Sequence, residues 1–330
     1  LLRVCDTAKT HSGISYSLTD IGKHRCTVTP KDFLGHTARG FAMGAADIVP
    51  GVSGGTIALI LGVYERLLAS IRTGARSLSR LARGDISGFI EQFKSIEWPF
   101  IIPLMTGIVA AFLVLSSVLD RLLINEPEAM AGLFFGLVVA SIFLAWQLLS
   151  NRDPGRMAVL VAVAVVAFFV LGLKSGSVSD PSAIAFFFTG AIAICAMILP
   201  GISGSFLMLM LGMYAAFVGA VHDREITNLL FFVLGALAGL AAFSTLLWWI
   251  LEHHRDTLLA ALIGLMAGSL RVLWPWPNGV GTIEDDATEQ ISGTTIDLPD
   301  DVGQAWLPIV LAIVAYAVVT GLNRFTPATS

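Results

Sequence analysis

Long apolar runs separated by short polar loops make up most of this chain. A helix needs about 20 apolar residues to cross a hydrocarbon core about 30 Å thick. Six uninterrupted runs come close to that length or exceed it, at 98–119, 129–149, 157–173, 228–251, 257–274 and 305–323. The pattern therefore predicts an all-α membrane protein.

Two further apolar stretches, 33–68 and 183–220, are interrupted by helix-breaking turns. The interruptions read PGVSGG at Pro50–Gly55 and PGISGS at Pro200–Ser205. Each arm beside a break has about 12–17 residues and would cover about 18–25 Å, which is less than the core thickness. Broken backbone at this depth is tolerated only where protein or a wet cavity covers it. We therefore expect each stretch to form a re-entrant helical hairpin.

The two interrupted stretches are copies of one unit. DIVPGVSGGTIALILGVY (Asp47–Tyr64) aligns with MILPGISGSFLMLMLGMY (Met197–Tyr214) at an offset of 150 residues, and the identities include Pro50, Gly51, Ser53, Gly54, Gly62 and Tyr64. Further on, Gly107 matches Gly235 at an offset of 128, because the basic loop after the first hairpin has no counterpart. We predict a polar cytoplasmic tail at 1–30 and two repeats, 31–175 and 181–325. Each repeat is a hairpin plus three transmembrane helices, so three crossings invert the second repeat relative to the first.

Charge supports a membrane location and sets the topology. Charged residues make up 13% of the chain, against about 25% in soluble domains, and the mean hydropathy is +0.80. With both termini in the cytoplasm, the inner segments hold 16 of the 20 lysines and arginines, while the loop 276–304 is acidic. This asymmetry follows the positive-inside rule. The three cysteines, Cys5, Cys26 and Cys195, form no CxxC pair, so neither a disulfide framework nor a metal site is indicated.

The hairpin turns carry the candidate chemistry. Pro50 and Pro200 end the first arms, and Gly51 and Gly201 permit backbone conformations closed to other residues. A serine then caps the second arm, whose first amides have no intrahelical acceptor and lie at the positive end of the helix dipole. Such an end favours anions. The predicted anion-binding residues are Ser53, Gly54, Gly55, Thr56, Ser203, Gly204 and Ser205. The alternative is that these turns serve only close packing of the hairpin tips.

Two charged residues near the first tip add to the candidate site. Asp47 lies three residues before Pro50, and its partner in the second copy is Met197. An ionisable group at that depth is a functional candidate, so Asp47 is our candidate for ion coupling; the alternative is a hydrogen bond that caps the tip. Arg39 lies two turns upstream on the same face and is a further candidate for binding an anionic headgroup. Snorkelling of Arg39 to the cytoplasmic headgroups is the alternative.

The segment GAADIVPGVSGGTIALILGVYERLL (Gly44–Leu68), together with the second PGISGS copy, closely resembles the domain-of-unknown-function 368 family. The resemblance covers about residues 31–325. It implies a polyprenyl-phosphate transporter that returns undecaprenyl phosphate, or a related lipid carrier, across the cytoplasmic membrane for cell-envelope polymer synthesis. Opposed helix ends at the midplane of inverted repeats are a common transporter site and agree with that activity.

The alternatives to a lipid transporter are a small-anion transporter or channel that uses the same tips, and an intramembrane enzyme. A transporter or channel for a small anion would need a polar path, which the nearly uncharged spans disfavour. An intramembrane enzyme would need a nucleophile with an acid, base or metal, and the spans offer one Asp at the first tip and no central His. We therefore expect no enzyme and no cofactor. Expected partners are polyprenyl phosphate and membrane lipids, with a homodimer as one assembly open to the chain and no nucleic acid.

Overall fold

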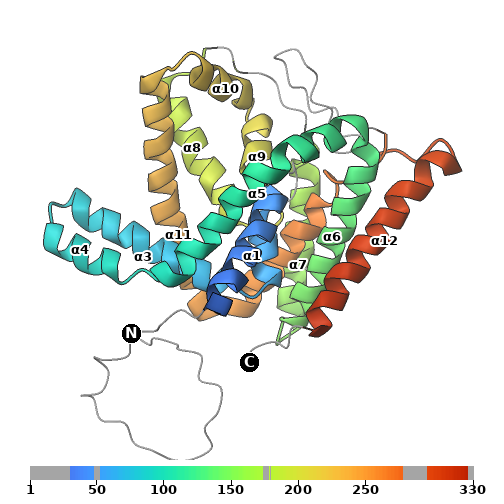
Figure 1. The fold of residues 1–330 in the computed structure, drawn as a ribbon, viewed down its shortest axis with the longest axis horizontal. Coiled ribbons are helices and arrows are strands. Elements are labelled where there is room, and N and C mark those ends of the chain that lie inside the picture. The colour runs from blue at the N-terminus through green and yellow to red at the C-terminus, as the bar shows by residue number, and fades with distance from the viewer. Residues whose placement is uncertain (1–29, 48–52, 174–177, 179, 278–295, 326–330) are drawn as a thin grey trace, which may run out of the picture.

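The computed structural model describes residues 30–47, 53–173, 178, 180–277 and 296–325, and its regular elements there are all helices (Figure 1). The all-α class is therefore confirmed for this part of the chain. The polar tail and the turn residues Pro50 and Gly51 lie outside the described residues. The helices are α1 (Pro30–Asp47), α2 (Gly54–Ile60), α3 (Tyr64–Ala82), α4 (Ile86–Lys94), α5 (Trp98–Asn125), α6 (Pro127–Gln147), α7 (Pro154–Val170), α8 (Ala183–Ile198), α9 (Gly204–Met210), α10 (Tyr214–His222), α11 (Ile226–Ser269) and α12 (Val302–Phe325).

Several of these helices are suited to a bilayer. Within the described ranges, α5, α6, α11 and α12 are long and apolar enough to cross a membrane, and the bent pair α9–α10 makes a fifth candidate. The 44-residue α11 contains a non-helical residue, His254, and so consists of two helical segments. It runs along one edge of the molecule, turns at its base and rises again (Figure 1). The chain is thus a multi-pass helical membrane protein, while the exact number of crossings stays a prediction.

The second arm of each hairpin is shorter than the sequence suggests. Helices α2 and α9 have seven residues each, about 10 Å of helix. Both end at a glycine with positive φ, Gly62 at 68° and Gly212 at 69°. There the chain bends, by 109° between α9 and α10. The apolar pattern continues through both bends, so hydropathy alone extended these arms to residues 68 and 220.

Glycines set how closely the longest helices pack. A side chain at Gly40 or Gly107 would overlap the backbone across the α1–α5 contact, and the same holds for Gly190 and Gly235 in the α8–α11 contact. The GxxxG pair Gly132 and Gly136 brings α6 against the backbone of α12 in the same way. Small residues at such crossings let helix backbones approach closely in a membrane. These contacts hold the two hairpins in fixed positions against α5 and α11.

Candidate functional site

The tips of the two hairpins touch. The Ser53 hydroxyl donates to the Leu199 carbonyl over 3.1 Å, and the Gly201 amide donates to the Thr56 hydroxyl over 2.9 Å. Both Ser53 and Thr56 are buried, with 1% and 0% exposure. These bonds join residues about 146 positions apart in the sequence. The two turns singled out by the repeat therefore form one structural unit, in which Thr56 serves to link the tips.

A cavity of about 510 Å³ opens beside the joined tips. Its polar side chains come from both hairpins: Asp47 and Ser53 from the first, and Ser203 and Ser205 from the second. The rest of the lining is apolar and comes from α5, α8, α9, α10 and α11, including Phe112, Gly190, Met197, Phe217, Phe232 and Ala236. The polar groups therefore sit in a low-dielectric surrounding, where hydrogen bonds to an ion are stronger than in water.

The donors of the first tip are already paired. The Gly54 amide donates to the Asp47 carboxylate over 2.5 Å, and the Gly55 amide donates to the Ser53 hydroxyl over 3.1 Å. The Thr56 amide donates to the Ser53 carbonyl over 2.9 Å. Asp47 thus makes the capping bond that was the alternative to its coupling role, while it also lines the cavity. The first tip carries its own anion.

The second tip lacks that internal anion. Met197 occupies the position that Asp47 has in the first hairpin. The Met197 side chain lies against Gly204, as the Asp47 side chain lies against Gly54. The amides of Gly204 and Ser205 have no hydrogen-bond acceptor among the described residues. The hydroxyls of Ser203 and Ser205 lie 2.8 Å apart and bond to each other. The donors left for a ligand are therefore concentrated on the second tip.

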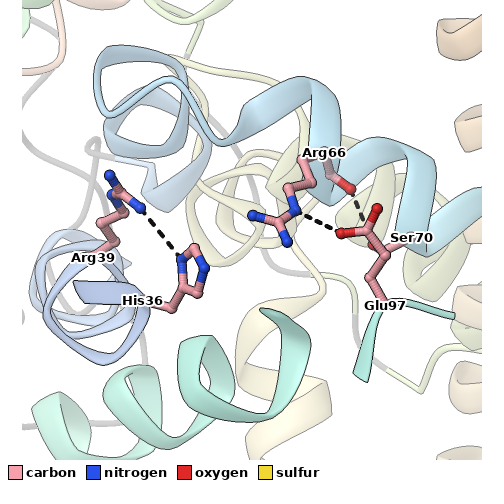
Figure 2. A network of polar contacts seen from close by, with 5 residues as sticks. All are labelled: His36, Arg39, Arg66, Ser70 and Glu97. Atoms are coloured by element: carbon pink, nitrogen blue, oxygen red, sulfur yellow. Dashed lines mark hydrogen bonds and ion pairs between the residues drawn. The ribbon is translucent and has the colours of Figure 1, made fainter. Parts of the chain in front are cut away.

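Arg39 does not line this cavity. Its guanidinium donates to Nδ1 of His36 over 3.3 Å, and Figure 2 shows this pair on α1 facing Arg66 and Glu97. His36 is buried edge-on against Phe100, and Arg66 lies over the same ring and pairs with Glu97 at 2.6 Å. No basic side chain is found among the described residues that line the cavity. A headgroup role for Arg39 stays a prediction and would require a position other than the one seen here.

The walls of the cavity include residues that were not predicted from the sequence. Phe112, Phe217 and Phe232 come from helices read only as spans or hairpin ends. Gly190 and Ala236, small residues on α8 and α11, also line the cavity and were a weak signal in the sequence. In the described part of the chain, no group of three or more His, Cys, Asp or Glu side chains is placed to hold a metal ion.

Comparisons with known proteins agree on one family. A family model described as undecaprenyl phosphate translocase-like matches residues 43–291. A polyprenyl-phosphate transporter of Vibrio cholerae is 38% identical over 302 residues, covering 89% of this chain and 97% of the relative. A polyprenyl-phosphate transporter of Staphylococcus aureus is 30% identical over 310 residues, covering 87% and 95%. No solved structure matches the chain significantly. The chain belongs to the undecaprenyl phosphate translocase-like family.

Proposed function

We propose that this protein is a polyprenyl-phosphate transporter that carries the phosphate headgroup across the membrane through the cavity at the joined tips. The names of both relatives support this substrate. The observation that carries the proposal is that two hydroxyls of the second tip, and two amides with no acceptor among the described residues, lie at a cavity whose walls are mostly apolar. A phosphate monoester offers three acceptor oxygens, which match these donors. Binding of this kind requires no covalent chemistry.

The proposed architecture is a pair of inverted repeats. Equivalent positions make equivalent contacts in both halves. A side chain added at Gly107 would overlap the backbone of Thr37, and one added at Gly235 would overlap the backbone of Phe187, the residue that aligns with Thr37. The bends at Gly62 and Gly212 correspond in the same way. Two hairpins that enter from opposite sides would meet near the midplane, where substrate sites of inverted-repeat transporters lie.

The shape of the cavity fits a substrate with a lipid tail. Met197 and Phe112 line it and are 50% and 42% exposed, so the cavity reaches the surface that would face lipid. A prenyl chain could remain in the bilayer while only the headgroup enters. In the topology predicted from charge, α10 and the start of α11 lie in the outer half of the membrane. The cavity would then accept a headgroup from the outer leaflet, and rocking of one repeat against the other would release it to the cytoplasmic leaflet.

The test is transport by the purified protein in vesicles that contain polyprenyl phosphate, with leaflet exposure read by a phosphatase added outside. Ser205→Leu removes a hydroxyl from the cavity and fills it, and should slow transport on the order of tenfold or more, since a hydrogen bond to a charged group contributes about 1.5–3 kcal/mol. Thr106→Leu is the matched control, because Thr106 is exposed on α5 away from the cavity.

Two results would count against the proposal. Normal lipid transport by a folded Ser205→Leu variant would exclude the cavity as the headgroup site. Flux of a soluble anion such as chloride or inorganic phosphate, without movement of the lipid, would instead support the small-anion transporter.

A further inference from the structure

The hairpin α3–α4 extends sideways from the helical body beside one end of α11 (Figure 1). Its two helices are tied by a hydrogen bond from the Ser77 hydroxyl to the Phe89 carbonyl, at 3.2 Å. It is attached to α11 through Arg72, which lies over Trp248 at 5.2 Å, and through an ion pair between Glu65 and Arg255 at 3.0 Å. This segment belongs to the basic loop that has no counterpart in the second half of the chain.

A second cavity, of about 310 Å³, lies on this hairpin and is lined by Arg76, Ser79, Arg80, Arg83 and Gln92. Three arginines therefore border one space. Their charge is barely neutralised: Arg80 lies 3.9 Å from Asp85, and no described carboxylate forms an ion pair with Arg76 or Arg83. Asp85 instead accepts hydrogen bonds from the Gly88 amide at 2.8 Å and the Ser87 hydroxyl at 3.1 Å, as the cap of α4.

Exposed apolar side chains lie on the same two helices, on faces that point away from this basic cavity. Leu78 and Leu81 on α3 are 39% and 42% exposed. On α4, Ile86, Ile90 and Phe93 are exposed to a similar or greater degree. Helices that combine basic and large apolar side chains in this way lie in the interfacial layer of a membrane.

We propose that the α3–α4 hairpin lies in the headgroup layer of the cytoplasmic leaflet and that its arginine cavity binds the phosphate of an anionic phospholipid. Guanidinium groups match phosphate oxygens through paired hydrogen bonds. The apolar side chains favour a lipid over a free phosphate ion, because they would hold the hairpin at the membrane surface, where phospholipid headgroups are the abundant phosphates. Arg76 lies twelve residues beyond Tyr64 on α3, about 18 Å further along the helix, so this cavity is separate from the one at the tips.

The test compares single substitutions on the same hairpin that each remove one positive charge. Arg76→Gln and Arg83→Gln alter the cavity, whereas Lys94→Gln removes one positive charge from α4 outside it. Purified full-length protein is titrated with phosphatidylglycerol in a neutral detergent, and retained lipid is counted by native mass spectrometry. Loss of one arginine beside an anionic headgroup should weaken lipid retention about five- to tenfold, and the triple variant with Arg80→Gln should lose it. Lys94→Gln should retain the lipid.

Three outcomes would overturn this inference. Equal retention by the arginine variants and Lys94→Gln would mean that the cavity is not the lipid site. Displacement of the lipid by millimolar inorganic phosphate would identify a site for the soluble ion. Equal retention of phosphatidylcholine and phosphatidylglycerol would mean that the headgroup charge is not recognised. A melting temperature equal to that of the parent in neutral detergent serves as the folding control for every variant.

Discussion

Replacement of Met197 by aspartate is expected to abolish transport. The substitution places a carboxylate next to Gly204, where Asp47 stands next to Gly54 in the first hairpin. The new carboxylate would accept the hydrogen bonds that we assign to the headgroup and would repel its negative charge. Two unit charges about 5 Å apart interact by about 3 kcal/mol at an effective dielectric of about 20, which corresponds to more than a hundredfold loss of binding. The measurement is headgroup binding and transport in vesicles.

Two control substitutions separate charge from shape at this position. Met197→Asn has nearly the size of aspartate without its charge, and Met197→Leu keeps the apolar character of the wall. Both should transport at rates much closer to that of the parent than to that of Met197→Asp. A folded Met197→Asp variant that transports normally would show that the second tip does not hold the headgroup.

The substitution Asp47→Asn should have the opposite effect on binding. Asparagine can still accept the hydrogen bond from the Gly54 amide, but the substitution removes the one acidic side chain found among the described residues that line the cavity. An anionic headgroup should then bind on the order of tenfold to a hundredfold more tightly, because a like charge within the site is gone. Turnover should fall, since a headgroup held more tightly is released more slowly. Because Asp47 is the coupling candidate, the rate should also become independent of an imposed proton gradient.

The measurement is equilibrium binding of polyprenyl phosphate together with initial transport rates, with and without the gradient. The double variant Asp47→Asn/Met197→Asp restores the original charge of the cavity and should bind better than Met197→Asp alone. Weaker binding by Asp47→Asn would mean that the carboxylate contributes to the headgroup site instead of opposing it.

Local sequence chemistry was enough to locate the tips. The Pro-Gly-x-Ser-Gly turns stand out because proline and glycine inside an apolar run interrupt the helix. An interrupted backbone at that depth in a membrane must be covered by other parts of the protein or line a wet cavity. The repeat then indicated that two such breaks would meet. In the structure the tips touch through Ser53 and Thr56, as that interpretation requires.

The unequal state of the two tips could not be read from the turns alone. Both copies present Ser-Gly after Pro-Gly, so both appeared equally able to bind an anion. The difference lies in Asp47 and Met197, whose side chains reach the tip only because each first arm packs beside its own second arm. Likewise, Arg39 shares a helical face with Asp47 but lies beside His36, two turns from the cavity. The spacing of residues along a helix predicts which side of the helix they share. It does not predict which neighbouring group a long side chain contacts along the helix axis.

The most direct test of the account is to determine the structure of the protein with polyprenyl phosphate bound. We expect phosphate density within hydrogen-bond distance of the Ser203 and Ser205 hydroxyls and the Gly204 amide, with the prenyl chain leaving between α5 and α11. Phosphate density away from both tips, with the cavity filled by side chains, would contradict the central claim.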